Sequence, residues 1–253
     1  MKHKIKMVVS DLDDTLLRSD KSVSEYTKRI LSRCRDAGIK VVYATARSAR
    51  ADSIVPVELF DGRIVMNGAV VRINDTVVHC RLIPYQTARP LLMACDRHGL
   101  RISSEAGGMH YSNYKVSDVW PHITYFRIVD FSVHDIDTEK LCIPINNPDV
   151  VEFIEAQLPE ELYLKLSNDG LAMVMHKEAT KSKAAAELAR LWGIAPDEIA
   201  AFGDDLNDID LLSYAGIGVA MENAHSEVKA IADLVCPDND NDGVAKWLEE
   251  NVL

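Results

Sequence analysis

The amino-acid sequence predicts an α/β fold in which a parallel sheet flanked by helices is interrupted by a second, smaller α+β domain. Near both ends of the chain, short segments that are apolar on both faces alternate with amphipathic helical segments, as in parallel sheets covered by helices. The pattern changes in the middle of the chain, where six of the nine prolines fall. A chain of 253 residues has room for one large or two small domains.

The first part of the chain begins with a buried strand and continues as a strand–helix–strand unit. Ile30, Leu31 and Cys34 share one side of the expected helix, and Gly38 is a typical C-terminal stop. A turn at residues 44–47 is expected to lead into another helix. The other elements expected here are a strand at 5–10, a helix at 24–35, a strand at 39–43, a strand within 62–69 and a hairpin within 70–78.

Residues 84–177 are expected to form the inserted domain, because helical segments at 86–98 and 148–157 alternate there with strands rich in Tyr, Ile and Val. The α/β pattern then resumes in residues 178–253. Its expected elements are a helix at 180–192 that ends at Gly193, a strand at 199–202, a helix at 207–214, a strand at 217–221, and helices at 225–232 and 244–250. Residues 1–83 and 178–253 together would form the larger domain.

Composition and charge exclude several classes of protein. The 28 basic and 39 acidic residues give a net charge of −11, and because such a chain repels a phosphate backbone, no nucleic-acid partner is expected. The apolar runs are far shorter than the ~18 residues that span a bilayer, so no membrane partner is expected. The five cysteines are scattered and include no C-x-x-C pair, which favours free thiols in the cytoplasm.

Two clusters of carboxylates follow two of the expected strands. Asp11 and Asp13 come directly after the first strand, and Asp204 and Asp208 follow the strand at 199–202. Taken alone, the first cluster also fits a set of helix N-caps. Ligands of open parallel sheets, however, bind at the carboxyl ends of strands, and four carboxylates that converge there repel one another unless a cation lies among them. Oxygen ligands without a nearby His or Cys favour Mg²⁺, and such a site suits phosphoryl transfer.

The same residues occur in the order of a known family pattern. The four motifs of the haloacid dehalogenase-like (HAD) hydrolase superfamily resemble Asp11-x-Asp13-x-Thr15, Thr45, a lysine upstream of the second cluster, and Gly203-Asp204-x-x-Asn207-Asp208. The insertion lies between the second and third motifs, like the C2-type cap of the Cof-like phosphatases. Two further segments are similar to that subfamily, namely Asn67-Gly68-Ala69 and Val219-Ala220-Met221-x-Asn223-Ala224. The resemblance implies a Rossmann-like HAD core with an inserted α+β cap.

Three lysines are candidates for the third motif: Lys177, Lys181 and Lys183. Helical geometry distinguishes the last two. Lys181 begins the apolar stripe of its helix, which continues through Ala184, Ala185 and Leu188. Lys183 instead shares the opposite, solvated face with Glu187 and Arg190. Lys181 is therefore expected to point toward the sheet and to be the catalytic lysine.

The resemblance implies a role for each motif residue. Asp11 is expected to attack phosphorus and form an aspartyl-phosphate, and Asp13 to protonate the leaving oxygen and then deprotonate the attacking water. Relatives that dehalogenate or pump ions lack a carboxylate at the position of Asp13, so phosphate-monoester chemistry is favoured. The phosphate is expected to contact Lys181, Thr45, Asn207 and the backbone at Leu12 and Ala46. The cofactor is expected to be Mg²⁺, at a metal site formed by the Asp11 carboxylate, the Asp13 main-chain carbonyl and Asp204, with Asp208 in support.

Arg47, which follows Thr45-Ala46, has two possible functions. Its guanidinium group can bind an anionic substrate, or it can pair with a nearby carboxylate.

Some patterns are not interpreted as sites. Asp238-x-Asp240-x-Asp242-Gly243 matches an EF-hand loop, but no entering helix precedes it, so an acidic turn that caps the last helix is expected instead. The histidines have no zinc-ligand spacing. Glu105-Ala-Gly-Gly-Met109 is expected to be a hairpin turn in the inserted domain, where His110, Tyr111 and Asn113 are candidate substrate contacts.

The sequence thus predicts an Mg²⁺-dependent phosphatase that hydrolyses small phosphomonoesters, such as sugar or other metabolite phosphates. A phosphomutase of the phosphomannomutase type is an alternative, because it shares these motifs and this type of cap. A phosphate-binding module without turnover is the alternative from another class of protein.

Overall fold

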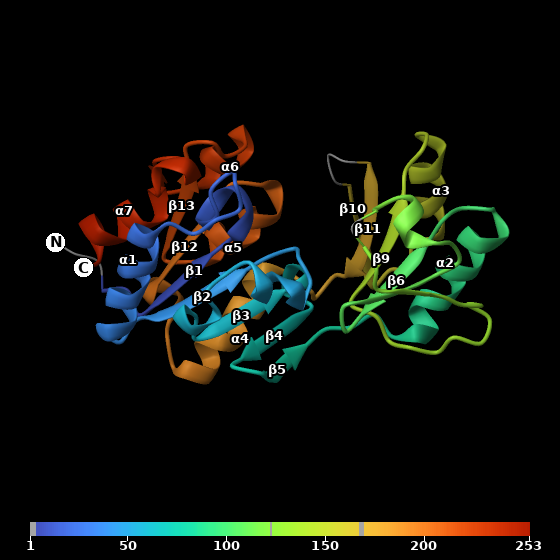
Figure 1. Ribbon diagram of the computed structural model, residues 1–253, viewed down its shortest axis with the longest axis horizontal. Coiled ribbons are helices and arrows are strands. Elements are labelled where there is room, and N and C mark those ends of the chain that lie inside the picture. The colour runs from blue at the N-terminus through green and yellow to red at the C-terminus, as the bar shows by residue number, and fades with distance from the viewer. Residues whose placement is uncertain (1–3, 122, 167–169) are drawn as a thin grey trace. The chain divides into compact units, whose positions relative to one another are not determined.

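The computed structural model describes residues 4–121, 123–166 and 170–253. The chain forms two compact units, each with its own sheet (Figure 1). The larger unit consists of the residues up to Cys80 together with Thr180–Leu253, and the smaller unit consists of Arg81–Ala179. The predicted fold class, an α/β core with an inserted α+β unit, is confirmed.

The larger unit is built on an eight-stranded sheet. Its strands in spatial order are β14 (Leu234–Cys236), β13 (Ile217–Met221), β12 (Ile199–Gly203), β1 (Met7–Ser10), β2 (Lys40–Ala44), β3 (Gly62–Val65), β4 (Val70–Ile73) and β5 (Thr76–Cys80). The strands from β14 to β3 are parallel, and β4 and β5 add an antiparallel edge.

The position of β1 in this sheet determines where a ligand can bind. β1 lies between β12 and β2, with Ser10 opposite both Phe202 and Tyr43. The chain leaves β1 toward β2 on one side and returns to β12 on the other, so the strand order reverses at β1. Crevices at such reversal points, beyond the carboxyl ends of the strands, are where α/β sheets bind ligands.

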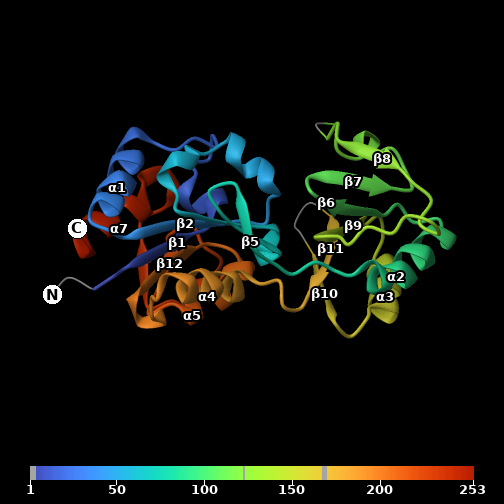
Figure 2. The same cartoon turned by 90° about the horizontal axis from the view of Figure 1, so that it is seen from below.

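Helices cover both faces of this sheet. Figure 2 shows α1 (Glu25–Asp36) and α7 (Gly243–Asn251) on one face, and α4 (Lys181–Trp192) and α5 (Ile209–Tyr214) on the other. The short α6 (Ser226–Ile231) packs against α5 and β13. The Ser24 side chain caps α1, and Gly193 ends α4 in the left-handed conformation. Among the described residues, no helix has the length and apolar character needed to cross a membrane.

The smaller unit has a six-stranded sheet covered by α2 (Tyr85–Arg97) and α3 (Asp149–Gln157). Its strands in spatial order are β10 (Leu162–Leu166), β11 (Leu171–His176), β9 (Lys140–Pro144), β6 (Ser103–Ala106), β7 (Met109–Ser112) and β8 (Phe126–Ile128). Leu91 and Ile154 from the helices pack onto Leu141 and Val174 from the sheet. The predicted turn between residues 105 and 109 is confirmed as the β6–β7 hairpin.

The helix expected after Arg47 is absent, and that prediction was wrong. Only two 3-10 turns, Ala49–Ser53 and Val57–Leu59, follow β2. The Asp52 carboxylate accepts hydrogen bonds from the Tyr43 hydroxyl and from Arg63 Nη1, the latter at 2.7 Å, and both donors lie on the sheet. This tertiary contact holds the first turn against β2 and β3 and prevents a regular helix.

Candidate active site

The candidate site lies beyond the carboxyl ends of three neighbouring parallel strands. Asp11 follows β1, Thr45 follows β2, and Asp204 follows β12. The Asp11 amide donates to the carbonyl of Phe202 at 3.0 Å, which continues the β1–β12 pairing up to the site. The sheet order therefore brings together residues that are almost 200 positions apart in the sequence.

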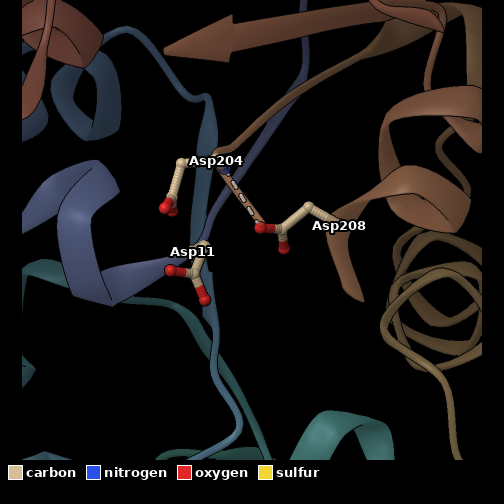
Figure 3. A group of neighbouring side chains, drawn as sticks. All are labelled: Asp11, Asp204 and Asp208. Carbon is tan, nitrogen blue, oxygen red and sulfur yellow. Dashed lines mark hydrogen bonds between the residues drawn. The ribbon is translucent and has the colours of Figure 1, made fainter. Parts of the chain in front are cut away.

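Three carboxylates converge at this edge. Asp11, Asp204 and Asp208 each offer an oxygen, and these oxygens all lie within 4.8 Å of one another (Figure 3). Asp11 is 6% exposed and Asp208 is fully buried. At an effective dielectric constant of ~20, two unit charges at this separation repel by about 3–4 kcal/mol. The cluster therefore needs positive charge to be stable in its ionised form.

Lys181, the first residue of α4, supplies part of that charge. Its ammonium group donates to Asp11 Oδ1 at 2.5 Å and to Asp208 Oδ1 at 2.6 Å, and the residue is 1% exposed. Ala184, Ala185 and Leu188 are buried on the same side of α4, whereas Lys183 is exposed. The helix orientation predicted from the sequence is thus confirmed, and it places Lys181 against the carboxylates.

Asp208 holds the loop after β12 in shape. Its Oδ2 accepts hydrogen bonds from the backbone amides of Asp204 and Asp205 at 3.1 and 3.2 Å, while its Oδ1 accepts from Lys181. Both of its oxygens are therefore occupied by donors of the protein. Its carboxylate can approach so closely because Gly203 has no side chain.

Gly203→Ala is expected to disturb this loop. A Cβ at position 203 would lie 2.4 Å from both Cβ and Cγ of Asp208, which is short, fully buried and unable to retreat. We expect the free energy of unfolding to fall by about 1–3 kcal/mol in urea titrations, the usual cost of overpacking. Phosphate release is expected to fall as well. Wild-type values of both quantities would contradict the close approach of Asp208.

The pKa values reflect the crowding of charges. Burial is the main cause that raises the pKa of Asp11, and it exceeds the opposing effect of Lys181. Burial, followed by the charges of Asp208 and Asp14, raises the pKa of Asp204 to about 7, although Thr15 Oγ1 donates to it at 2.6 Å. Burial alone would lower the pKa of Lys181, but the charges of Asp11 and Asp208 raise it above its ordinary value. The lysine is therefore a permanent cation.

Asp13 is not part of this cluster and binds two cations. Arg47 donates to it from Nε at 2.5 Å and from Nη2 at 2.7 Å, and Lys21 Nζ lies 3.1 Å from its Oδ1. Burial would raise the pKa of Asp13, but Arg47 and then Lys21 outweigh that effect and lower it. Of the two functions considered for Arg47, the structure shows pairing with a carboxylate.

The other predicted site residues lie in the loops that follow β1, β2 and β12. Thr45 is buried, and its Oγ1 accepts a hydrogen bond from the Arg47 amide at 3.1 Å. Leu12 follows Asp11 and is fully buried, and Ala46 follows Thr45 and is partly exposed. Asn207 lies in the 3-10 turn after β12, and its amide group donates to Asn67 Oδ1 at 2.9 Å.

Sequence reasoning assigned no function to Asn67 or Lys21, although both contact predicted site residues. Asn67 belongs to the Asn67-Gly68-Ala69 segment, whose similarity to the subfamily was a usable signal. Lys21 carries no such signal, because it reaches Asp13 only through the turn at residues 18–22.

The carboxylate cluster fits a hard divalent cation. All three side chains offer oxygen, the ligand type that Mg²⁺ prefers, and a bound cation would relieve the repulsion between their charges. Within residues 4–121, 123–166 and 170–253, no other group of three His, Cys, Asp or Glu side chains has this arrangement. Since both oxygens of Asp208 already accept hydrogen bonds, Asp11 and Asp204 are the better direct ligands.

The acidic turn at residues 238–242 has a function beyond the one expected. Its carboxylates bind the segment that follows the first motif: Asp240 accepts from Ser19, and Asp242 accepts from Arg18 at 2.7 Å. Asp242 is the N-cap residue of α7 but makes no capping hydrogen bond with its side chain. The turn therefore precedes the last helix and supplies its N-cap residue, as predicted, but it caps α7 through the backbone carbonyls of Asp238 and Asp242 and not through a carboxylate.

The three candidate contacts in the inserted domain all have partners within that unit. His110 lies beside Ser103 and Glu105, and Tyr111 packs its ring on His134. Asn113 accepts from the Ile102 amide and donates to Asp96 and to the Leu100 carbonyl. Asn113 thus has a structural function that connects α2 to β7.

Fold and site together define a protein with a mostly parallel α/β core and a buried carboxylate centre at the ends of its strands. A family model for haloacid dehalogenase-like hydrolases matches residues 8–248, and the chain belongs to that family. It is 28% identical to the 5-amino-6-(5-phospho-D-ribitylamino)uracil phosphatase YitU of Bacillus subtilis, with 99% of this chain and 98% of that protein covered.

Solved structures agree with this assignment. A phosphatase of the superfamily from Bacteroides thetaiotaomicron superposes with a TM-score of 0.85 at 28% identity, covering 97% of this chain and 94% of the other. A sugar phosphatase of HAD subclass IIB superposes with a TM-score of 0.83 at 26% identity, covering 97% and 98%. The protein is thus a phosphatase of this superfamily that acts on small phosphorylated substrates.

Proposed function

We propose that the protein hydrolyses phosphomonoesters through an aspartyl-phosphate on Asp11, with Mg²⁺ as cofactor. The observation that carries this proposal is the buried contact between the Asp11 carboxylate and the Lys181 ammonium group at the end of β1. A buried lysine that remains charged fixes one oxygen of Asp11, so the carboxylate is held in a single orientation. A nucleophile held in this way has lost little freedom before it attacks.

The chemical steps follow from the residues around Asp11. Arg47 and Lys21 hold Asp13 as a carboxylate, so Asp13 first has to leave these cations and take up a proton from water. A carboxylate oxygen of Asp11 then attacks phosphorus, and the bond from phosphorus to the ester oxygen breaks as that oxygen takes the proton from Asp13. A water molecule then attacks the phosphoryl group, Asp13 accepts its proton, and the bond to Asp11 breaks to release inorganic phosphate. Before substrate binds, Arg47 holds both oxygens of Asp13 and so keeps this acid–base group in place.

The phosphate would be bound by groups from three loops and by Lys181 at the start of α4. Thr45, Asn207, Lys181 and the backbone at Leu12 and Ala46 would contact the transferring phosphoryl group. Mg²⁺ would be held by Asp11, Asp204 and the main-chain carbonyl of Asp13, with Asp208 supporting Asp204, and would neutralise charge on the phosphoryl oxygens.

The substrate class we propose is a small polyhydroxylated metabolite that carries one phosphate ester, such as a sugar phosphate. Two relatives support it, because one is named as a sugar phosphatase and the other acts on a phosphorylated ribityl chain. We further propose that the enzyme works in the cytoplasm, since all five of its cysteines are free thiols.

The metal requirement can be measured by phosphate release from p-nitrophenyl phosphate and a panel of sugar phosphates. We expect turnover with Mg²⁺ and a fall of more than about 10²-fold in EDTA, because Lys181 is then the main cation left to oppose the charge on the phosphoryl group. Isomerisation of mannose or glucose phosphate without phosphate release would instead establish a mutase.

Metal binding also has a readout that does not depend on turnover. Mg²⁺ at 100 times its dissociation constant should stabilise the folded state by about 2.7 kcal/mol, visible as a higher melting temperature. Asp204→Asn is expected to abolish this shift. Asp197→Asn makes the same charge change at an exposed site and should retain it. An undiminished shift in Asp204→Asn would contradict the proposed ligand set.

A further inference from the structure

The turn Met66–Gly68, between β3 and β4, has an uncommon backbone. All three residues have positive φ values, 52° for Met66, 55° for Asn67 and 104° for Gly68. For a residue other than glycine this conformation costs about 1–2 kcal/mol, and two of the three are not glycine. The turn is also buried, with Met66 fully enclosed and Asn67 4% exposed. Such a conformation persists only where the surrounding contacts determine it.

Those contacts reach the segments that carry the second and fourth motifs. The Asn67 amide donates to the Thr45 carbonyl and the Met66 amide to the Arg47 carbonyl, both at 2.9 Å. The Asn67 side chain accepts a hydrogen bond from the Asn207 amide group at 2.9 Å, across 140 positions of sequence. Asn67 thus connects the loop after β2 to the loop after β12.

The same turn also touches the segment that carries the third motif. A Cβ on Gly68 would lie 2.2 Å from the carbonyl oxygen of Thr180, the residue before Lys181. The backbone of the turn is therefore packed directly against the N-terminus of α4. The three segments that carry Thr45, Lys181 and Asn207 therefore all contact the turn Met66–Gly68.

We propose that Asn67 is a positioning residue that orients the Asn207 amide toward the substrate phosphate, an inference that rests on the proposed function. An amide group has two N–H bonds in one plane. The hydrogen bond to Asn67 Oδ1 uses one of them and fixes the plane, which determines where the second one points. Because Asn67 also holds the backbone of Thr45, it sets the two phosphate-binding side chains relative to each other.

The conformation of Asn67 allows a clean test. Glycine adopts a φ of 55° without strain, so Asn67→Gly keeps the backbone path and removes the side chain with its Oδ1 acceptor. Stability is expected to change little, because relief of the backbone strain offsets the lost hydrogen bond, whereas kcat/KM for p-nitrophenyl phosphate should fall by about 10- to 100-fold. The inhibition constant for inorganic phosphate should rise. A purely structural asparagine would give the opposite result, with lower stability and wild-type kinetics.

Asn74→Gly is the matched control. Asn74 has a φ of 52° and lies exposed in the turn between β4 and β5, away from Asn207. It undergoes the same substitution in the same backbone conformation, so it measures the effect of the backbone change alone. Its kinetics should remain those of the wild type.

A double-mutant cycle tests whether Asn67 acts through Asn207. If it does, Asn67→Gly should add little more than a twofold loss to Asn207→Ala, because the group it orients is already absent. Additive losses, or wild-type kinetics and phosphate inhibition in Asn67→Gly, would overturn the inference.

The inference and the proposed function can fail separately. If the wild type releases no phosphate from any compound tested, calorimetric binding of inorganic phosphate with Mg²⁺ takes the place of kinetics. Equal phosphate affinities in the wild type and Asn67→Gly would then overturn the inference alone. No phosphate binding by the wild type would overturn both.

Discussion

Asp11→Asn is expected to lower kcat by at least about 10³-fold and to leave the fold intact. The carboxamide cannot act as the anionic nucleophile, and loss of a nucleophile has costs of this order or larger. Its carbonyl oxygen can still accept the hydrogen bond from Lys181, so the local geometry is retained. Phosphate release and the melting temperature, measured on the same preparation, test both parts of the prediction.

The direction of the stability change follows from the pKa of Asp11. Burial raises this pKa in the folded state, so at neutral pH the ionised carboxylate costs folding free energy that the unfolded chain does not bear. A neutral isostere removes that cost. The melting temperature of Asp11→Asn should therefore equal or exceed that of the wild type.

Asp14→Asn is the control for charge and position. Asp14 lies three residues further on, its side chain is 54% exposed, and its φ of 57° is one that asparagine tolerates. The two substitutions remove the same charge from the same loop. Equal activity losses in both variants would show that charge, and not a nucleophile at position 11, is responsible.

Much of the fold could be predicted from the sequence because its signals are local. The strands β1 and β12 are uninterrupted apolar runs, Ser24 caps α1 with its side chain, and Gly193 ends α4 in the left-handed conformation. The helix expected after Arg47 failed for the opposite reason. There the carboxylate of Asp52 binds Arg63 on the sheet, a tertiary contact that no local pattern indicates.

The same distinction holds for the candidate site. Helical spacing alone predicts the face of α4 on which Lys181 lies, and the structure confirms that face. The partner of Arg47 and the link between Asn67 and Asn207 depend on which loops the sheet brings together. Charge and residue type alone allow several partners for each of these side chains.

Lys181→Met is expected to lower both stability and activity, because it removes the cation among Asp11, Asp204 and Asp208. Breaking a buried ion pair by removing one partner costs about 3–5 kcal/mol, since the other charge remains buried without compensation. Methionine has a similar length, so little of this loss comes from a cavity. Urea unfolding should report the full decrease, and kcat should fall by about 10²- to 10³-fold.

Two further variants separate the effect of charge from the effect of packing. They are Lys183→Met and the double variant Lys181→Met with Asp208→Asn. Lys183 is exposed on the other face of α4, and its replacement should change the free energy of unfolding by less than about 0.5 kcal/mol. Adding Asp208→Asn to Lys181→Met removes one of the charges left uncompensated, so part of the lost stability should return while activity stays low. No recovery in the double variant would show that packing, and not charge, is the cause.

Mg²⁺ provides the last part of this test. Without Lys181 the carboxylates have only a bound cation to neutralise them, so the variant should bind Mg²⁺ more tightly than the wild type does. At one Mg²⁺ concentration, its melting temperature should therefore rise by more than that of the wild type. An equal or smaller rise would mean that Lys181 and the metal do not act on the same carboxylates, which would contradict the electrostatic basis of the site.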